Sequence, residues 1–222
     1  MQAQLLDLFS TAATFDNFIP LKNEATLNAL KSFSNQFIHL TGGNLSGKTH
    51  LLQSWVRLAM ANKKKAIYID SAVDDSVNFR DINSKFDFIA IDNIEYLNAI
   101  QQILLFDLFN SIKLGNMQVF LLTSSNNILD KITTLRDDLK TRLGSGLNLH
   151  LNALDDNEIK QALILYTNQQ GIKLGDLEIN FLINHCKRNI GILITVVHDI
   201  AENAVLTNRN ITIPLIKAIL KI

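Results

Sequence analysis

Residues 42–49 read GGNLSGKT, and these eight residues are the most informative motif for the fold of the chain. It matches the eight-position pattern G-x-x-x-x-G-K-[ST], whose glycines let successive backbone N–H groups point inward around phosphate oxygens. The candidate phosphate-binding residues are Gly42, Gly43, Asn44, Leu45, Ser46, Gly47, Lys48 and Thr49. A glycine-rich turn with an incidental Lys-Thr pair is the alternative, and the flanking sequence argues against it.

The segments on either side of this loop have the periodicity that a phosphate loop requires. The apolar run Phe37–Leu40 precedes it and is typical of a buried strand, whereas the apolar residues after Lys48 recur at helical spacing. A helix that begins at the loop directs the positive end of its dipole at a bound anion. We therefore expect Lys48 to reach the β- and γ-phosphates of ADP or ATP, and the Thr49 hydroxyl to bind Mg²⁺.

A second apolar run, Phe86–Ile91, ends in Asp92, an acid suited to hold Mg²⁺ or its water shell beside a phosphate loop. An acid that merely terminates a strand is the alternative. Many ATPases place another acid directly after this aspartate to polarise the attacking water, but this chain has Asn93, which cannot act as a base. Glu95 lies two positions further and would need a different geometry. The sequence therefore favours nucleotide binding over efficient unaided hydrolysis.

Strand and helix signals alternate through the first part of the chain. The apolar runs are continuous, as is typical of parallel strands that helices cover on both faces. The expected strands are Phe37–Leu40, Ala66–Ile69, Phe86–Ile91 and Val119–Leu122. Helices are expected after Lys48 and over residues 97–112, the latter with a buried stripe of Leu97, Ile100, Leu104 and Leu108. The predicted fold class is α/β, a parallel sheet flanked by helices.

No strand signal recurs beyond about Leu151, so a small all-α subdomain is expected at the C-terminal end. Asp155 and Glu158 are spaced as a capping box at the start of its first helix. Helical stretches over residues 177–186 and 192–205 follow, and Pro214 suits the first turn of a last helix. We predict an N-terminal peptide over residues 1–12, an α/β core over residues 13–151 and a helical subdomain over residues 152–222.

Composition narrows the function classes. The chain has 222 residues, 47% of them hydrophobic, and its 21 Lys+Arg and 21 Asp+Glu give a formal net charge of zero. Balanced charge disfavours binding of nucleic acid through bulk electrostatics, since such domains are usually strongly basic. The single cysteine, Cys186, excludes an internal disulfide framework. With no targeting segment or membrane-length apolar run visible, we expect a cytoplasmic protein without membrane contact.

Three segments resemble the ATPase domain of the bacterial DnaA initiator family, a group of AAA+ proteins. They are TFDNFI at residues 14–19, IDNIE at residues 91–95 and TIPLIKAIL at residues 212–220. The chain resembles short regulatory members of this family, which lack a DNA-reading domain. The resemblance implies an AAA+ core followed by a helical lid, with Phe18, Ile19 and His50 joining the nucleotide site.

The segment LKTRLGSGL at residues 139–147 resembles the part of this family that carries the arginine finger. The resemblance implies that Arg142 reaches the γ-phosphate of a neighbouring subunit and stabilises charge in the transition state. A surface or salt-bridged arginine is the alternative. The strand at residues 119–125 resembles the sensor I strand, with Ser125 where relatives usually have an acid. The family places a sensor II arginine where this chain has Gly191, with Arg188 three residues earlier.

The N-terminal peptide QLLDLF, residues 4–9, is similar to the motifs that dock on the bacterial DNA polymerase sliding clamp. In such a peptide Leu8 and Phe9 would fill an apolar pocket while the Gln4 amide hydrogen-bonds at a second site, with Leu5 between them. Its spacing is one residue longer than the commonest form. A strand or helix packed on its own domain is the alternative.

Together these resemblances imply a regulator of replication initiation. It would hold ADP or ATP, dock on the DNA-loaded sliding clamp, and stimulate ATP hydrolysis by DnaA, so that the initiator is inactivated and cannot start a second round. DNA contact would be indirect or weak, and a homodimer is compatible with the family. An autonomous AAA+ ATPase such as a helicase loader stays open as the alternative, as does a structural subunit stabilised by its nucleotide.

Overall fold

The computed structural model describes residues 13–74, 78–80, 82–115, 118–187 and 189–222. The predicted N-terminal peptide, residues 1–12, lies outside this described part. The elements of the first unit are η1 (Leu21–Asn23), α2 (Glu24–Lys31), β1 (Phe37–Thr41), α3 (Lys48–Ala61), β2 (Ala66–Asp70), α4 (Ile82–Lys85), β3 (Phe88–Asp92), η2 (Ile94–Tyr96), α5 (Ala99–Leu114), β4 (Phe120–Ser125), η3 (Leu129–Lys131), α6 (Asp137–Gly144) and β5 (Leu147–His150).

The described strands form a parallel sheet in the order β2-β3-β4-β1-β5. This confirms the predicted fold class. Each of the four predicted runs overlaps a strand. The strands extend one to three residues beyond the ends of the runs, and β3 and β4 begin two residues and one residue later than theirs. The edge strand β5 was not predicted, because its residues alternate between half-buried and exposed and so make no continuous apolar run.

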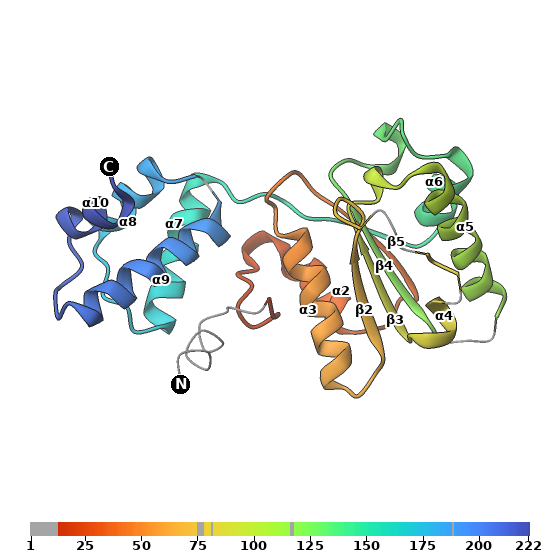
Figure 1. The fold of residues 1–222 in the computed structure, drawn as a ribbon, viewed down its shortest axis with the longest axis horizontal. Coiled ribbons are helices and arrows are strands. Elements are labelled where there is room, and N and C mark those ends of the chain that lie inside the picture. The colour runs from red at the N-terminus through yellow and green to blue at the C-terminus, as the bar shows by residue number, and fades with distance from the viewer. Residues whose placement is uncertain (1–12, 75–77, 81, 116–117, 188) are drawn as a thin grey trace. The chain divides into compact units, whose positions relative to one another are not determined.

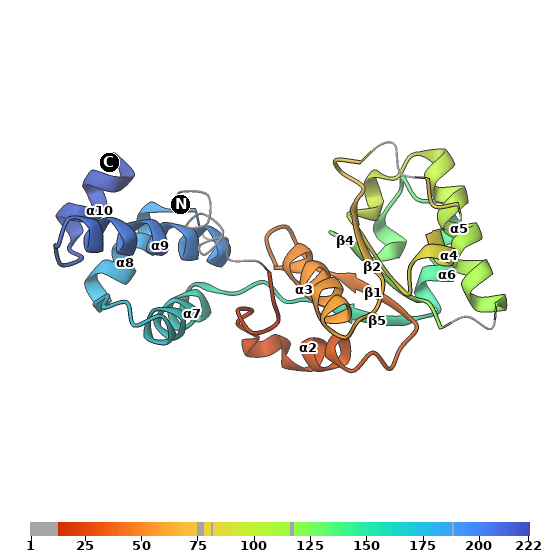
Figure 2. The ribbon, with the colours of Figure 1, turned by 60° about the horizontal axis from the view of Figure 1, so that its bottom comes forward.

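Helices cover both faces of this sheet, as Figures 1 and 2 show. On one face α2 and α3 enclose an apolar cluster that contains Leu51, Leu52 and Trp55. On the other face α5 and α6 enclose a second cluster that contains Leu105 and Leu139. The β1 strand lies between β4 and β5, so the loop that follows it emerges at the carboxyl edge of the sheet and is held on both sides.

The predicted buried stripe of α5 is wrong at Ile100, whose side chain is 70% exposed. The helix begins at Ala99, after an Asn98 cap whose partner in the capping box is Gln101. Its buried face is made of Gln101, Gln102, Leu105, Leu108, Phe109 and Ile112. Because α5 is apolar around much of its circumference, the spacing of its leucines and isoleucines is compatible with more than one stripe.

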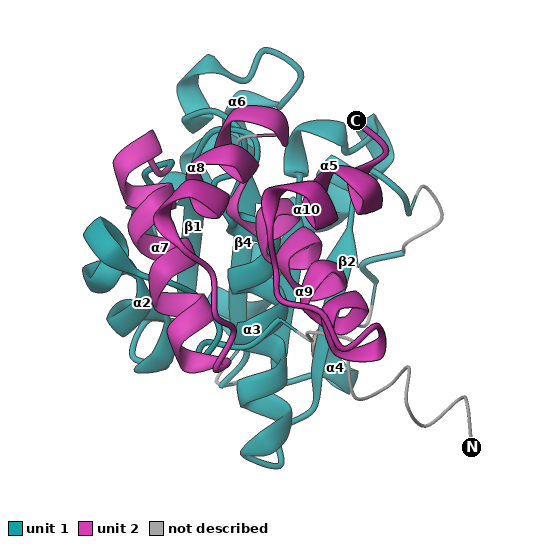
Figure 3. Cartoon of the chain, turned by 90° about the vertical axis from the view of Figure 1, so that its left-hand side faces the viewer, with its two compact units in different colours: residues 1–153 teal, residues 154–222 magenta. Residues whose placement is uncertain are grey.

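The second compact unit spans Leu154–Ile222 and is coloured separately in Figure 3. It consists of α7 (Asp156–Gln169), α8 (Asp176–His185), α9 (Ile190–Leu206) and α10 (Ile213–Leu220). The predicted capping box is confirmed, since the Glu158 amide donates to Asp155 Oδ1 at 2.9 Å and the Asp155 amide donates to Glu158 Oε2 at 2.7 Å. The core of the unit is apolar and fully buried at Leu163, Leu182, Leu193, Val197, Ile200 and Ile216.

Candidate functional site

Two glycines of the loop at residues 42–49 stand where a side chain would not fit. Gly47 has φ +98°, and a Cβ there would come within 2.9 Å of the Phe18 ring. A Cβ on Gly42 would lie 2.8 Å from the carbonyl oxygen of Leu151. The loop therefore needs glycine both for its left-handed turn and for close packing, and this packing brings Phe18 against it.

Lys48 is the first residue of α3 and is only 5% exposed. Its Nζ donates to the carbonyl oxygens of Gly42 and Gly43 at 2.7 and 2.9 Å, and to Asn126 Oδ1 at 2.9 Å. All three ammonium protons are thus engaged with oxygen acceptors. Burial lowers the pKa of Lys48, while the charges of Asp92 and Glu95 act in the opposite direction.

Asp92 ends β3, is fully buried, and accepts hydrogen bonds on both carboxylate oxygens. Oδ2 accepts from the Thr49 hydroxyl at 2.6 Å and from the Tyr68 hydroxyl at 3.0 Å. Oδ1 accepts from the Ser124 hydroxyl and from the Asn93 amide. Burial raises the pKa of Tyr68, and the negative charge of Asp92 raises it further. The predicted pair Thr49 and Asp92 therefore lies together, as a hydroxyl and a carboxylate that share one hydrogen bond.

Asn93 and Glu95 turn toward different neighbours. Asn93 has a left-handed backbone, φ 58°, and its Nδ2 donates to Asp70 Oδ1 at 2.8 Å. Glu95 Oε1 accepts from the backbone amide and from Nδ2 of Asn126, at 3.0 and 2.6 Å. Asn93 is thus held at the end of β2, whereas Glu95 reaches the end of β4 and, through Asn126, the Lys48 ammonium.

Asn126 is a residue of this site that the sequence analysis did not single out. The family resemblance indicated Ser125 instead, but the Ser125 hydroxyl donates to the Asn127 carbonyl at 2.6 Å and lies 3.0 Å from His39 Nε2. The other ring nitrogen of His39 lies 2.8 Å from the Thr123 hydroxyl. Ser125 therefore belongs to a buried set of polar contacts between β1 and β4, together with His39 and Thr123. The position one residue beyond the β4 strand end is what directs Asn126 to the loop.

The other predicted cofactor residues lie in or beside the loop and differ in their contacts and burial. His50 Nε2 lies 2.9 Å from the Thr14 carbonyl oxygen, and its ring centroid is 5.5 Å from that of Phe18. Ser46 Oγ is buried and has no hydrogen-bond partner among the described residues. Half-buried or exposed positions are taken by Ile19, Gly43, Asn44 and Leu45. A role of these residues in binding a nucleotide stays a prediction.

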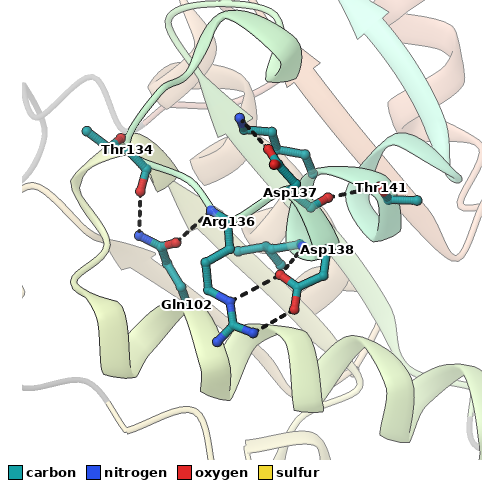
Figure 4. A network of polar contacts seen from close by, with 8 residues as sticks. Gln102, Thr134, Arg136, Asp137, Asp138 and Thr141 are labelled. Carbon is teal, nitrogen blue, oxygen red and sulfur yellow. Dashed lines mark hydrogen bonds and ion pairs between the residues drawn. The ribbon is translucent and has the colours of Figure 1, made fainter.

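Arg142 lies on α6. Figure 4 shows the polar contacts around the start of this helix. The buried Gln102 of α5 donates to the Thr134 carbonyl at 3.0 Å and accepts from the Arg136 amide at 3.0 Å. Arg136 in turn binds the Asp138 carboxylate with two nitrogens. The Arg142 guanidinium lies 5.6 Å from the centre of the Phe106 ring, and no acidic partner for it is found within the described ranges.

Two further predictions concern the sensor II position and the clamp motif. Gly191 is the second residue of α9, after an Asn189 cap, so no side chain stands at the expected sensor II position, and Arg188 lies outside the described residues. The clamp-motif residues Gln4, Leu5, Leu8 and Phe9 lie outside them as well. Over the described residues, no cluster of three His, Cys, Asp or Glu suited to a metal ion is found, and no helix has the length and apolarity to cross a membrane.

Comparison with known structures identifies relatives of the fold. Domain III of the replication initiation protein DnaA from Thermotoga maritima superposes with a TM-score of 0.75 and 23% identity, over 96% of this chain and 97% of that one. The AMPPCP-bound DnaA from Aquifex aeolicus superposes with a TM-score of 0.72 and 21% identity, over 86% of this chain and 65% of that one. These likenesses show that the chain has the fold of DnaA domain III.

Comparison of sequences gives the family. An uncharacterized protein of Haemophilus influenzae is 28% identical, over 95% of this chain and 94% of its own length. The chromosomal replication initiator protein DnaA of Aliarcobacter butzleri is also 28% identical, over 96% of this chain but 53% of its own length. The family model "Hda, lid domain" matches residues 155–220, and the model "Bacterial DnaA ATPAse domain" matches residues 10–150. The chain therefore belongs to the family of the bacterial DnaA ATPase domain, and its C-terminal unit is a lid of the Hda kind.

Proposed function

We propose that this chain binds ADP or ATP, with Mg²⁺, in the loop at residues 42–49. The buried and unpartnered Ser46 hydroxyl supports this, since it is a donor that a phosphate oxygen would satisfy. Lys48 would exchange the carbonyl oxygens of Gly42 and Gly43 for phosphate oxygens. Thr49 and Asp92 offer the oxygen ligands that Mg²⁺ prefers, and the ion would neutralise phosphate charge there.

The nucleotide-bound chain would act as a regulator of replication initiation that stimulates ATP hydrolysis by DnaA. The observation that carries this proposal is Arg142. Its half-buried guanidinium rests on the Phe106 ring with no carboxylate of the described chain attached, so its charge is available to a second molecule. Arg142 belongs to α6, and this helix covers the face of the sheet opposite to the one covered by the phosphate-loop helix α3. Arginine fingers supplied to a partner accelerate hydrolysis by about 10³–10⁵-fold.

We further propose that residues 1–12 tether the chain to the DNA-loaded sliding clamp through Gln4, Leu5, Leu8 and Phe9. A peptide anchor leaves the folded body free and raises its effective concentration near DnaA. With zero net charge, the chain would meet DNA indirectly or weakly. Inactivated DnaA would then be unable to begin a second round of replication, and the protein would work in the cytoplasm at the replisome.

The test is single-turnover hydrolysis of ATP by DnaA, measured with clamp loaded on DNA. The Arg142→Ala variant is expected to lose the stimulation while it keeps nucleotide and clamp affinity. A matched control is Arg57→Ala, which removes an exposed guanidinium from α3 on the other face of the sheet and should stimulate fully. Full stimulation by Arg142→Ala would refute the finger assignment.

The tether has its own test. A chain without residues 1–12 should no longer bind the loaded clamp in a pull-down, whereas its nucleotide affinity should not change, because the loop and its neighbours lie in the described core. Retained clamp binding by the shortened chain would exclude the peptide as the anchor.

An autonomous AAA+ ATPase, such as a helicase loader, is the second candidate. The complete loop together with Asp92 and Glu95 favours it, since both carboxylates lie near Lys48. Against it, Asn93 is bound to Asp70 and offers no base. The two proposals separate on turnover by the isolated chain, which the second requires and the first does not. A homodimer is compatible with either and would be seen by sedimentation.

A further inference from the structure

Glu95 has an unusual position for an acid. It lies in η2, between the fully buried Ile94 and the exposed Tyr96, and the left-handed turn at Asn93 directs this segment back against β4. One carboxylate oxygen, Oε1, accepts two hydrogen bonds from Asn126. The other, Oε2, is buried and has no hydrogen-bond partner among the described residues. The carboxylate is therefore only partly compensated.

This carboxylate is linked to the phosphate loop through one amide group. Because a carboxylate can only accept, Asn126 must turn its Nδ2 toward Glu95 and its Oδ1 away from it. The Oδ1 atom accepts from Lys48 Nζ at 2.9 Å. Asn126 thus holds the Glu95 carboxylate on one side and the Lys48 ammonium on the other, within range of a direct electrostatic attraction.

The negative charge of Glu95 acts in opposite directions on the Lys48 ammonium and on an anionic ligand. The charge that attracts the Lys48 ammonium repels a phosphate that binds the same ammonium. At a buried site this repulsion is weakly screened, and it grows with the charge of the ligand. We propose that Glu95 is a specificity-determining residue of the nucleotide site, whose charge opposes the phosphate chain and opposes a triphosphate more than a diphosphate. This inference rests on the nucleotide binding proposed above.

The test compares affinities for Mg²⁺–ADP and for the non-hydrolysable triphosphate Mg²⁺–AMPPCP by titration calorimetry. Glu95→Gln removes the charge and keeps an amide oxygen that Asn126 can still reach. It should bind AMPPCP about tenfold more tightly and ADP about threefold more tightly than the unaltered chain, from a charge acting through a protein interior of moderate dielectric. The control Asp107→Asn removes one negative charge from the exposed side of α5 and should change neither affinity.

A second variant separates charge from positioning. Glu95→Met has a similar length and carries only a weakly accepting thioether in place of the carboxylate, so a charge effect predicts tighter binding in both variants. If both variants bind more weakly, or if Met weakens binding and Gln restores it, Glu95 serves only to position Asn126 and the proposal is overturned. Equal gains for ADP and AMPPCP, or none, overturn it too. Undiminished binding by Lys48→Ala would instead refute the nucleotide site itself, whatever Glu95 does.

Discussion

The buried histidine of β1 should make the core unstable toward acid. His39 is 1% exposed, lies between the Thr123 and Ser125 hydroxyls, and burial lowers its pKa from 6.5 to about 4. Since the folded-state pKa lies below the unfolded one, the unfolded chain takes up the proton first as the pH falls. The stability that the neutral ring contributes is complete above about pH 6.5 and is lost progressively down to about pH 4.

The size of the effect follows from these two pKa values. A shift from 6.5 to about 4 reduces the free energy of unfolding by about 2 kcal/mol between pH 7 and pH 5, and by about 3 kcal/mol below pH 4. His50 contributes in the same direction, because burial lowers its pKa as well. The part that belongs to His39 is therefore the difference in pH dependence between the unaltered chain and a His39→Asn variant.

Urea unfolding followed by the fluorescence of Trp55, the single tryptophan and a buried reporter of the same unit, measures this difference. The variant should be less stable at pH 7, where its hydrogen bonds and packing are altered, yet lose about 2 kcal/mol less on going to pH 5. The exposed His150 provides the control, since His150→Asn should keep the full dependence. A His39→Asn variant with an unchanged slope between pH 7 and pH 5 would refute the burial argument.

Three other substitutions test separate parts of the structure. Gly47→Ala should lower stability by about 1–2 kcal/mol and weaken nucleotide binding, because its φ of +98° and the Phe18 ring leave no room for a Cβ; an unchanged melting temperature and titration would contradict this. Gln102→Ala should lower stability by about 2 kcal/mol, by leaving the Thr134 carbonyl and Arg136 amide unpaired, with faster hydrogen exchange at the Arg136 amide as the specific signature. Asn98→Ala removes the cap of α5 and should lower stability by about 1 kcal/mol in urea unfolding, a loss that Asn98→Asp should largely avoid.

The sequence was sufficient for the parts of the fold that depend on local pattern. The loop at residues 42–49 and the apolar runs predicted a parallel sheet, and the spacing of Asp155 and Glu158 predicted the capping box that begins α7. Pattern failed where burial depends on neighbours. The strand β5 alternates because it is an edge strand, and α5 is apolar on so many sides that its buried face follows from what packs on it.

In the candidate site, too, residues that belong to a local motif could be predicted, and residues brought in by the fold could not. The consecutive residues of the loop and the strand-ending Asp92 could be recognised from their motifs. Asn126, Tyr68 and Ser124 could not, because they come to the site only through the order of the strands, which brings the ends of β2 and β4 beside the end of β3. The polar residues that follow the predicted run Val119–Leu122 are a signal that would have indicated Ser124 and Asn126, whereas Tyr68 lies in the middle of β2 and carries no such signal.

The order of the strands also affects how the chain can fold during synthesis. β1 is synthesised first, yet its partners in the sheet are β4 and β5. One edge of residues 37–41 is covered only when residues 121–125 have been made, and the other edge only when residues 147–150 have been made. The β2–β3 pair forms from nearer segments and can be in place while β1 still has no neighbour. The strand that leads into the phosphate loop is therefore the last to be enclosed as the chain emerges from the ribosome. Its apolar residues Ile38 and Leu40, which are buried in the folded chain, would stay exposed to chaperones until then.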